Sequence, residues 1–96
     1  MQFYAFDTET YLIEPGRLAP KLVCVSTSDG TSTQLLTPEQ GLDWFEERLR
    51  GKDTLVAHSA SFDVGVMVQA RPSLMPLVWE AYENGRIIDT RIVEQL

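Results

Sequence analysis

The feature that most constrains the fold is a pair of short apolar runs, each of which leads directly into polar residues. Residues 3–6 lead into Asp7, and residues 54–57 lead into His58. Apolar runs of this length, bounded by polar residues, are typical of strands that are buried on both faces. Such strands need helices packed on their sheet, so the two runs predict a layered α/β domain.

Turn and capping signals predict the other elements. Lys21 to Thr27 and Thr31 to Leu36 flank an Asp-Gly pair, which favours an antiparallel hairpin. Thr37-Pro38-Glu39-Gln40 combines a capping threonine, a proline at the first helical position and the glutamine of a capping box. A helix therefore begins here, and Gly51 ends it. We also expect helices over about 61–70 and 73–83, a short strand at 87–88, and a last helix from Asp89 or Thr90 through Leu96.

This order of elements predicts a mixed β-sheet flanked by helices, with the first and fourth strands as parallel neighbours. The 96 residues suffice for one small domain. The last helix has only about two turns where the sequence stops, and its Leu96 faces a core that it helps to build. We therefore expect residues 1–96 to be the N-terminal portion of a longer domain, with the C-terminal part of the fold missing.

The charge balance is acidic, with 14 Asp and Glu against 8 Lys and Arg and a net charge of -6. This balance excludes a protein that holds nucleic acid by a basic surface alone, but it leaves nucleic acid open as a substrate that bound cations would meet. The single cysteine, Cys24, excludes an internal disulfide and a cysteine-built zinc site, and its apolar neighbours predict a buried thiol. No apolar run approaches the ~20 residues of a membrane span. We expect a soluble protein of the cytoplasm, or of the host cytoplasm if a phage encodes it.

Asp7 and Glu9 are the first candidates for chemistry. They are two residues apart on a strand, so their side chains project to the same side, with the Cα atoms roughly 7 Å apart. Two such carboxylates can bind one hard cation, for which Mg²⁺ and Mn²⁺ are the usual choices. The alternative interpretation is a solvated strand end that carries two surface acids.

Asp63 is the third candidate. It lies in the first helical turn after the strand at 54–57, where the helix dipole alone would favour an acid. Ligand sites of open α/β sheets lie beyond the carboxyl ends of strands, however, and Asp7, Glu9 and Asp63 all follow such ends. If the two strands are parallel neighbours, the three carboxylates meet in one crevice, which favours a metal site.

The ordered set of motifs resembles a known family. Asp-Thr-Glu-Thr at 7–10, Ser-Phe-Asp at 61–63 and Ile-Asp-Thr at 88–90 are similar to motifs of the DEDD (DnaQ-like) 3′–5′ exonucleases, and most like those in the proofreading domains of phage family A DNA polymerases. The resemblance covers nearly the whole chain and implies a ribonuclease H-like fold. It also implies a two-metal hydrolysis at the 3′ end of single-stranded or frayed DNA, with RNA not excluded, and a polymerase domain in the full-length protein.

The same resemblance assigns roles to individual residues. Asp7, Glu9 and Asp63 would be catalytic and would bind two divalent cations, Mg²⁺ or Mn²⁺, with Asp7 bridging both. The substrate-binding residues would be Thr8, Thr10, Ser59 and Phe62. Two departures stand out: Ser59 takes the place of the family's asparagine, and the final Tyr-x-x-x-Asp or His-x-x-x-x-Asp motif is absent after Asp89.

Because the final carboxylate is missing, we expect the 96-residue chain to be weakly active or inactive by itself. One alternative is a truncated or degenerate exonuclease fold that binds metal or a partner without catalysis. Another is a small acidic α/β domain whose carboxylates are only surface features. His58 is expected to pack at a strand end or to border the substrate rather than to act as a base. Phe62, Trp44 and Trp79 are expected in the core.

Overall fold

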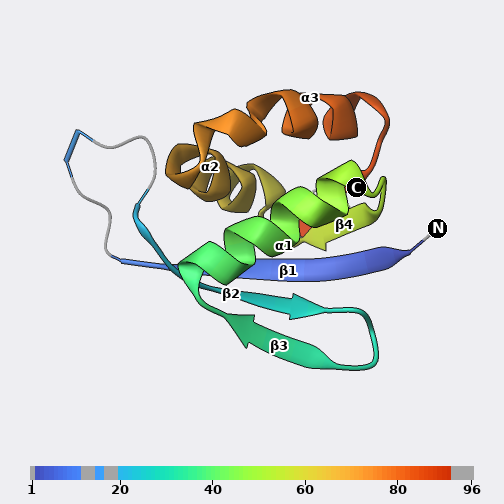
Figure 1. The fold of residues 1–96 in the computed structure, drawn as a ribbon, viewed down its shortest axis with the longest axis horizontal. Helices are drawn as coiled ribbons and strands as arrows, with labels where there is room; N and C mark the ends of the chain where they lie inside the picture. The colour runs from blue at the N-terminus through green and yellow to red at the C-terminus, as the bar shows by residue number, and fades with distance from the viewer. Residues whose placement is uncertain (1, 12–14, 17–19, 92–96) are drawn as a thin grey trace.

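A five-stranded mixed sheet with helices packed against one face forms the described part of the chain (Figure 1). The structure is a computed structural model and describes residues 2–11, 15–16 and 20–91. The strands are β1 (Phe3–Thr10), β2 (Leu22–Ser28), β3 (Thr33–Leu36), β4 (Thr54–Ala57) and β5 (Ile87–Asp89). The helices are α1 (Pro38–Arg50), α2 (Ala60–Ala70) and α3 (Met75–Glu83), with a 3₁₀ turn, η1 (Pro72–Leu74), before α3.

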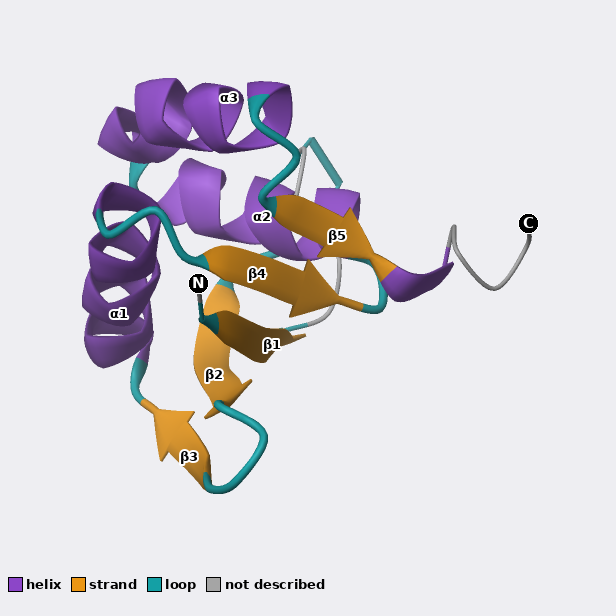
Figure 2. Ribbon diagram, turned by 90° about the vertical axis from the view of Figure 1, so that its right-hand side faces the viewer, coloured by secondary structure: helices purple, strands orange, loops and turns teal. Residues whose placement is uncertain are grey.

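The sheet has the order β3-β2-β1-β4-β5. The pairs β1–β2 and β2–β3 are antiparallel, whereas β4 runs parallel to both β1 and β5. The predicted hairpin and the predicted parallel pairing of the first and fourth strands are confirmed. In Figure 2 the arrows of β1, β4 and β5 point the same way, so these three strands end at one edge of the sheet. The α/β architecture predicted from the sequence is therefore present.

Helix α1 shows how local sequence sets an element. Thr37 accepts a hydrogen bond from the backbone N–H of Gln40, and the Gln40 side chain accepts one from the backbone N–H of Thr37. This is the predicted capping box, and Gly51 closes the helix as predicted. Gly41 lets the helix lie directly on β2, because a Cβ at this position would come within 2.3 Å of a Val25 methyl carbon.

The core lies between the helices and the sheet. Its largest fully buried side chains are Phe45, Leu49, Leu55, Met67 and Leu74. Because β1 alternates, Phe6 and Thr8 are buried under the helices whereas Asp7 and Glu9 are exposed on the other face.

Several expectations about burial were wrong. Phe3 is 57% exposed, so the first strand is covered on one face only in the described structure. Trp79 is 66% exposed on α3, and Phe62 is 43% exposed in the first turn of α2. Cys24 is half-buried because it faces the uncovered side of β2. Trp44, by contrast, packs against the core as predicted.

The expected last helix falls mostly on residues 92–96, which lie outside the described residues; Thr90 and Arg91 are helical. Among the helices that the structure describes, none is both long and apolar enough to cross a membrane.

Candidate functional site

The parallel strands bring the candidate residues to one edge of the sheet. Ala57, the last residue of β4, pairs with Asp89, the last residue of β5. Ala5 on β1 pairs with Val56 on β4, so Asp7 lies two residues further along β1 toward the same edge. Helix α2 begins directly after β4 and carries Asp63 in its first turn. Three segments distant in sequence, β1, α2 and β5, therefore contribute acids to one region.

Asp63 is buried at this edge, with 3% of its surface exposed. One of its oxygens, Oδ1, accepts a hydrogen bond from the backbone N–H of Thr8 at 3.3 Å and another from the Thr8 hydroxyl. Thr8 itself is buried, so this pair ties the first turn of α2 to β1. Such bonds supply the polar partners that a buried carboxylate requires.

The pKa of Asp63 is raised above its usual value. Burial is the largest cause, and the nearby negative charges of Asp7 and Asp89 raise the pKa further. The two hydrogen bonds from Thr8 act in the opposite direction without cancelling the effect. In the described part of the chain no Lys or Arg forms an ion pair with Asp63, and a bound cation would supply a positive charge there.

Asp89 has a role that sequence reasoning missed. Its Oδ2 accepts a hydrogen bond from the backbone N–H of Ala60 at 3.1 Å, and its Oδ1 accepts one from the backbone N–H of Arg91 at 2.9 Å. Ser59, the residue at the N-cap of α2, makes no capping bond with its side chain. The carboxylate of Asp89 thus caps α2 from β5, in addition to its place before the expected last helix.

The sequence contained a partial signal for this contact. The Ile-Asp-Thr segment places an acid at the end of a short apolar strand, and parallel strand ends meet at one edge. The spacing alone, however, does not reveal that the partner is an N–H group 29 residues earlier.

His58 is exposed and lies beside β5. Its Nδ1 is 3.2 Å from the Thr90 hydroxyl oxygen, and the Thr90 hydroxyl donates to the Ala57 carbonyl at 3.5 Å. These contacts agree with the interpretation of His58 as a residue that packs at a strand end.

The remaining predicted substrate residues lie around the same edge. The hydroxyl of Thr8 is bonded to Asp63 and faces the covered side of the sheet, whereas Thr10 is half-buried at the last position of β1. Ser59 is half-buried, and Phe62 exposes its ring beside Asp63.

The donor types suit a hard cation, since Asp7, Glu9 and Asp63 all offer carboxylate oxygens. Their arrangement in space, however, suits a cation less well than their chemistry does. Over residues 2–11, 15–16 and 20–91, no three Asp, Glu, His or Cys side chains form a group that could hold one metal ion. Asp63 uses its Oδ1 for the bonds to Thr8 on the covered face, whereas Asp7 and Glu9 alternate with Thr8 and are exposed; Asp7 is nevertheless close enough for its charge to raise the pKa of Asp63.

No protein-family model matches this chain, and no curated protein matches it. The chain's own residues therefore carry the functional proposal.

Proposed function

We propose that this chain is the N-terminal portion of a metal-dependent 3′–5′ exonuclease domain of the ribonuclease H-like type. Its substrate would be a single-stranded or frayed 3′ end of DNA, and its full-length protein a cytoplasmic DNA polymerase that proofreads. One observation carries the proposal: Asp7, Asp63 and Asp89 gather at one edge of a mixed α/β sheet, and the pKa of Asp63 is raised by burial and by the other two charges. The motif resemblance at 7–10, 61–63 and 88–90 supports it.

In this proposal Asp7, Glu9 and Asp63 hold two divalent cations. Bound Mg²⁺ or Mn²⁺ would supply an activated water and stabilise the leaving 3′ oxygen. The chain's own residues set the positions of the ligands. Thr8 holds the carboxylate of Asp63 against β1, and Asp89 holds the start of α2 against β5. These bonds join α2 to two different strands, so the first turn of α2 is positioned from both sides.

Metal binding in this proposal depends on pH. A carboxyl group must lose its proton to bind a cation, and the pKa of Asp63 is raised. Affinity for Mn²⁺ is therefore expected to fall as the pH decreases, and to begin falling at a higher pH than for carboxyls with ordinary pKa values.

The experiment is cleavage of a 3′-labelled single-stranded DNA in Mn²⁺ by the wild-type chain, Asp7→Ala and Asp43→Ala. Asp43 is an exposed acid on α1 that pairs with Arg71, so it serves as the matched control. We expect slow release of the labelled 3′ nucleotide by the wild type and by Asp43→Ala, and none by Asp7→Ala. Equal release by all three proteins would refute a catalytic role for Asp7.

A second candidate is a fold of the same kind that binds metal or a partner without cleaving. It is favoured by the two hydrogen bonds from Thr8 to Asp63, which occupy one carboxylate oxygen on the covered face. Here Mn²⁺ would bind in an Asp7-dependent manner, and the labelled DNA would remain intact even at high protein concentration. Measuring Mn²⁺ binding and cleavage on the same samples distinguishes the two functions.

A further inference from the structure

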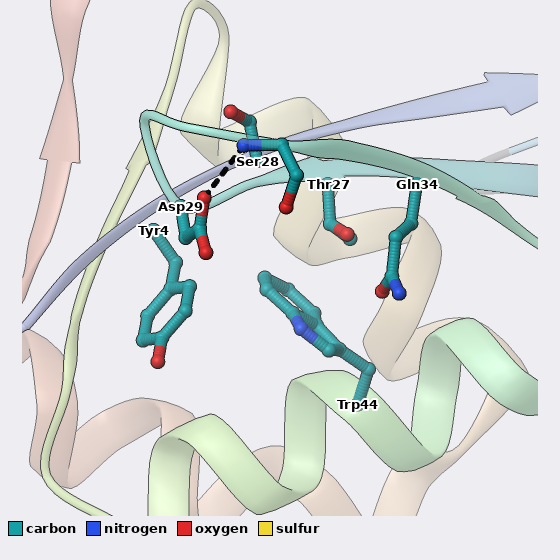
Figure 3. Close-up of a pocket in the computed structure, with 7 residues that line it drawn as sticks. Tyr4, Thr27, Ser28, Asp29, Gln34 and Trp44 are labelled. Carbon is teal, nitrogen blue, oxygen red and sulfur yellow. Dashed lines mark hydrogen bonds between the residues drawn. The ribbon is translucent and has the colours of Figure 1, made fainter.

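A small pocket lies between the β2–β3 hairpin, the start of β1 and helix α1 (Figure 3). Its volume is about 120 Å³. It opens on the face of the sheet that α1 covers, and Tyr4 contributes to it from the amino end of β1. The edge of the sheet that carries Asp7, Asp63 and Asp89 lies at the carboxyl end of the same strand, so the pocket is a separate feature of the molecule.

Two aromatic rings form the walls. The Tyr4 and Trp44 rings meet edge to face, with centroids 6.0 Å apart and an angle of 86° between the planes. The Arg48 guanidinium carbon lies 5.0 Å from the centre of the Tyr4 ring, and Phe6 packs against Trp44. The walls are therefore held in place by contacts outside the pocket, which lowers the entropy lost when a ligand enters.

Four hydrogen-bonding groups that line the pocket have no hydrogen-bond partner among the described residues. They are the hydroxyl of Tyr4, the hydroxyl of Thr27, the amide of Gln34 and the indole N–H of Trp44. Figure 3 shows Thr27 and Gln34 extending from the hairpin on the side where Trp44 lies. Thr27 is only 4% exposed, so its hydroxyl has little access to bulk water other than through the pocket.

Asp29 closes the pocket at the hairpin turn. Its Oδ1 accepts hydrogen bonds from the backbone N–H groups of Thr31 and Ser32, both at 2.9 Å, which leaves its Oδ2 without a bond to any described residue. Because of these two bonds the pKa of Asp29 is lowered, and the side chain remains an ionised acceptor at neutral pH.

We propose that this pocket binds a single planar imide ring of the uracil or thymine type. A cavity of roughly 150 Å³ accommodates one benzene ring, so this pocket has room for one six-membered ring and not for a fused purine. Two ring carbonyls would accept from the Trp44 indole N–H and the Thr27 hydroxyl, and the ring N–H between them would donate to the Gln34 or Asp29 oxygen. Because the Tyr4 and Trp44 planes are 86° apart, one of these rings can lie flat against a face of the bound ring while the other borders its edge.

The test uses Trp44 as its own reporter. Trp79 is the second tryptophan of the chain and lies outside the pocket on α3, so Trp79→Phe leaves Trp44 as the only indole fluorophore. Titration of this variant with uridine is expected to change Trp44 fluorescence saturably. Cytidine, which carries an amino group in place of one carbonyl, is expected to bind about tenfold more weakly, and adenosine more weakly still.

Gln34→Ala in the same background is expected to weaken uridine binding about tenfold, the loss of one to two hydrogen bonds. Thr33→Ala is the matched control, because Thr33 is the neighbouring exposed residue on β3 and projects away from the pocket. Circular dichroism of both variants checks that the fold is retained.

A comparison of thymidine with a short oligothymidylate distinguishes a free nucleoside from a base within a strand. Tighter binding of the oligomer assigns the pocket to a nucleic-acid strand, and equal binding assigns it to the free nucleoside. The proposal is overturned if uridine at millimolar concentration gives no saturable change, if adenosine binds as well as uridine, or if Gln34→Ala binds like Thr33→Ala.

Discussion

Two acidic regions of this molecule differ in whether a basic side chain pairs with them. Helix α1 carries three acids around one arginine of the segment that follows α2. Arg71 Nη2 lies 3.1 Å from Glu39 and 2.8 Å from Asp43, and its Nη1 lies 3.1 Å from Glu46. These contacts raise the pKa of Arg71, above all through the hydrogen bond to Asp43. These three α1 acids thus share one cationic partner within the fold.

Within residues 2–11, 15–16 and 20–91, the acids at the carboxyl edge of the sheet have no such partner. Among the described residues, no Lys or Arg side chain forms an ion pair with Asp7, Glu9, Asp63 or Asp89. Asp63 and Asp89 receive hydrogen bonds instead, and Asp63 keeps a raised pKa. Like charges left close together are a persistent cost to folding, which a bound cation would relieve. The difference teaches that the position of an acid in the fold, rather than the net charge of -6, indicates where a cation would bind.

The largest change in the free energy of unfolding is expected when Mn²⁺ is added. A cation that binds only the folded state adds about 2.7 kcal/mol to the free energy of unfolding at a hundredfold excess over Kd. Thermal unfolding in increasing Mn²⁺ measures this directly. We expect the gain in the wild type and in Asp43→Ala, and its loss in Asp7→Ala. A gain that survives in Asp7→Ala but disappears in Asp43→Ala would locate the cation on α1 and reverse the comparison.

Removal of the α2 cap is expected to have the next largest effect. Asp89→Ala leaves the Ala60 N–H without its partner, and loss of a cap destabilises a protein by about 1 kcal/mol. Asp89→Asn keeps an acceptor oxygen and should therefore lose less stability than Asp89→Ala. Denaturant unfolding of both variants at neutral pH gives the two values. Unchanged stability of Asp89→Ala would show that α2 is positioned by Thr8 and the core alone.

A smaller loss of stability, which depends on salt concentration, is expected when Arg71 is removed from its three acidic partners on α1. Arg71→Ala removes the cation that three acids share, and because they share one guanidinium we expect a loss in the range of one exposed ion pair, about 0.2–1 kcal/mol. The loss should shrink in high salt, because salt screens both the lost attraction and the repulsion that remains. Unfolding at low and high NaCl concentration tests this. If the loss is the same at both, packing of the Arg71 side chain rather than its charge is responsible.

The smallest change in the free energy of unfolding is expected for Asp63→Asn. This substitution should stabilise the protein, whereas the preceding ones destabilise it. A carboxyl whose pKa is raised in the folded state binds its proton more tightly there, so its contribution to stability is favourable at low pH and is lost as the pH rises through the folded pKa. Asparagine avoids this loss and keeps an oxygen that can accept from Thr8. The variant should therefore be more stable than the wild type at pH 7, and the difference should disappear below the ordinary carboxyl pKa of 3.8.

Thermal unfolding between pH 3 and pH 7 measures this difference. A variant that is less stable than the wild type at pH 7 would mean that the ionised carboxylate is net stabilising, contrary to the direction of its pKa shift.

Elements encoded by neighbouring residues could be predicted. The hairpin at Asp29-Gly30, the capping box at Thr37 and Gln40, and the strand Thr54–Ala57 were all predicted and are present. Each depends on bonds or on a hydrophobic pattern within a few residues. The meeting of β1, β4 and β5 at one edge was also predictable in outline, since β4 was expected to run parallel to β1.

Burial was predicted less well, because it depends on which elements cover a surface. Trp79 lies on an amphipathic helix, but α3 turns that ring outward to solvent. Phe3 lies in an apolar run, yet its side chain is on the face of the sheet that no described helix covers, as the side view shows (Figure 2). A sequence pattern shows that a residue is apolar; only packing decides whether another element lies over it.

The sequence by itself determined the order of strands and helices and the positions of the acids at 7, 9 and 63 along the chain. The tertiary structure alone decided that Asp63 bonds to Thr8, that Asp89 caps α2, and that Arg71 forms ion pairs with acids of α1. The physical reason is the separation of the partners along the chain. Capping and hairpin signals act over a few residues, whereas these three contacts join segments 25 or more residues apart and exist only once the sheet and helices have packed.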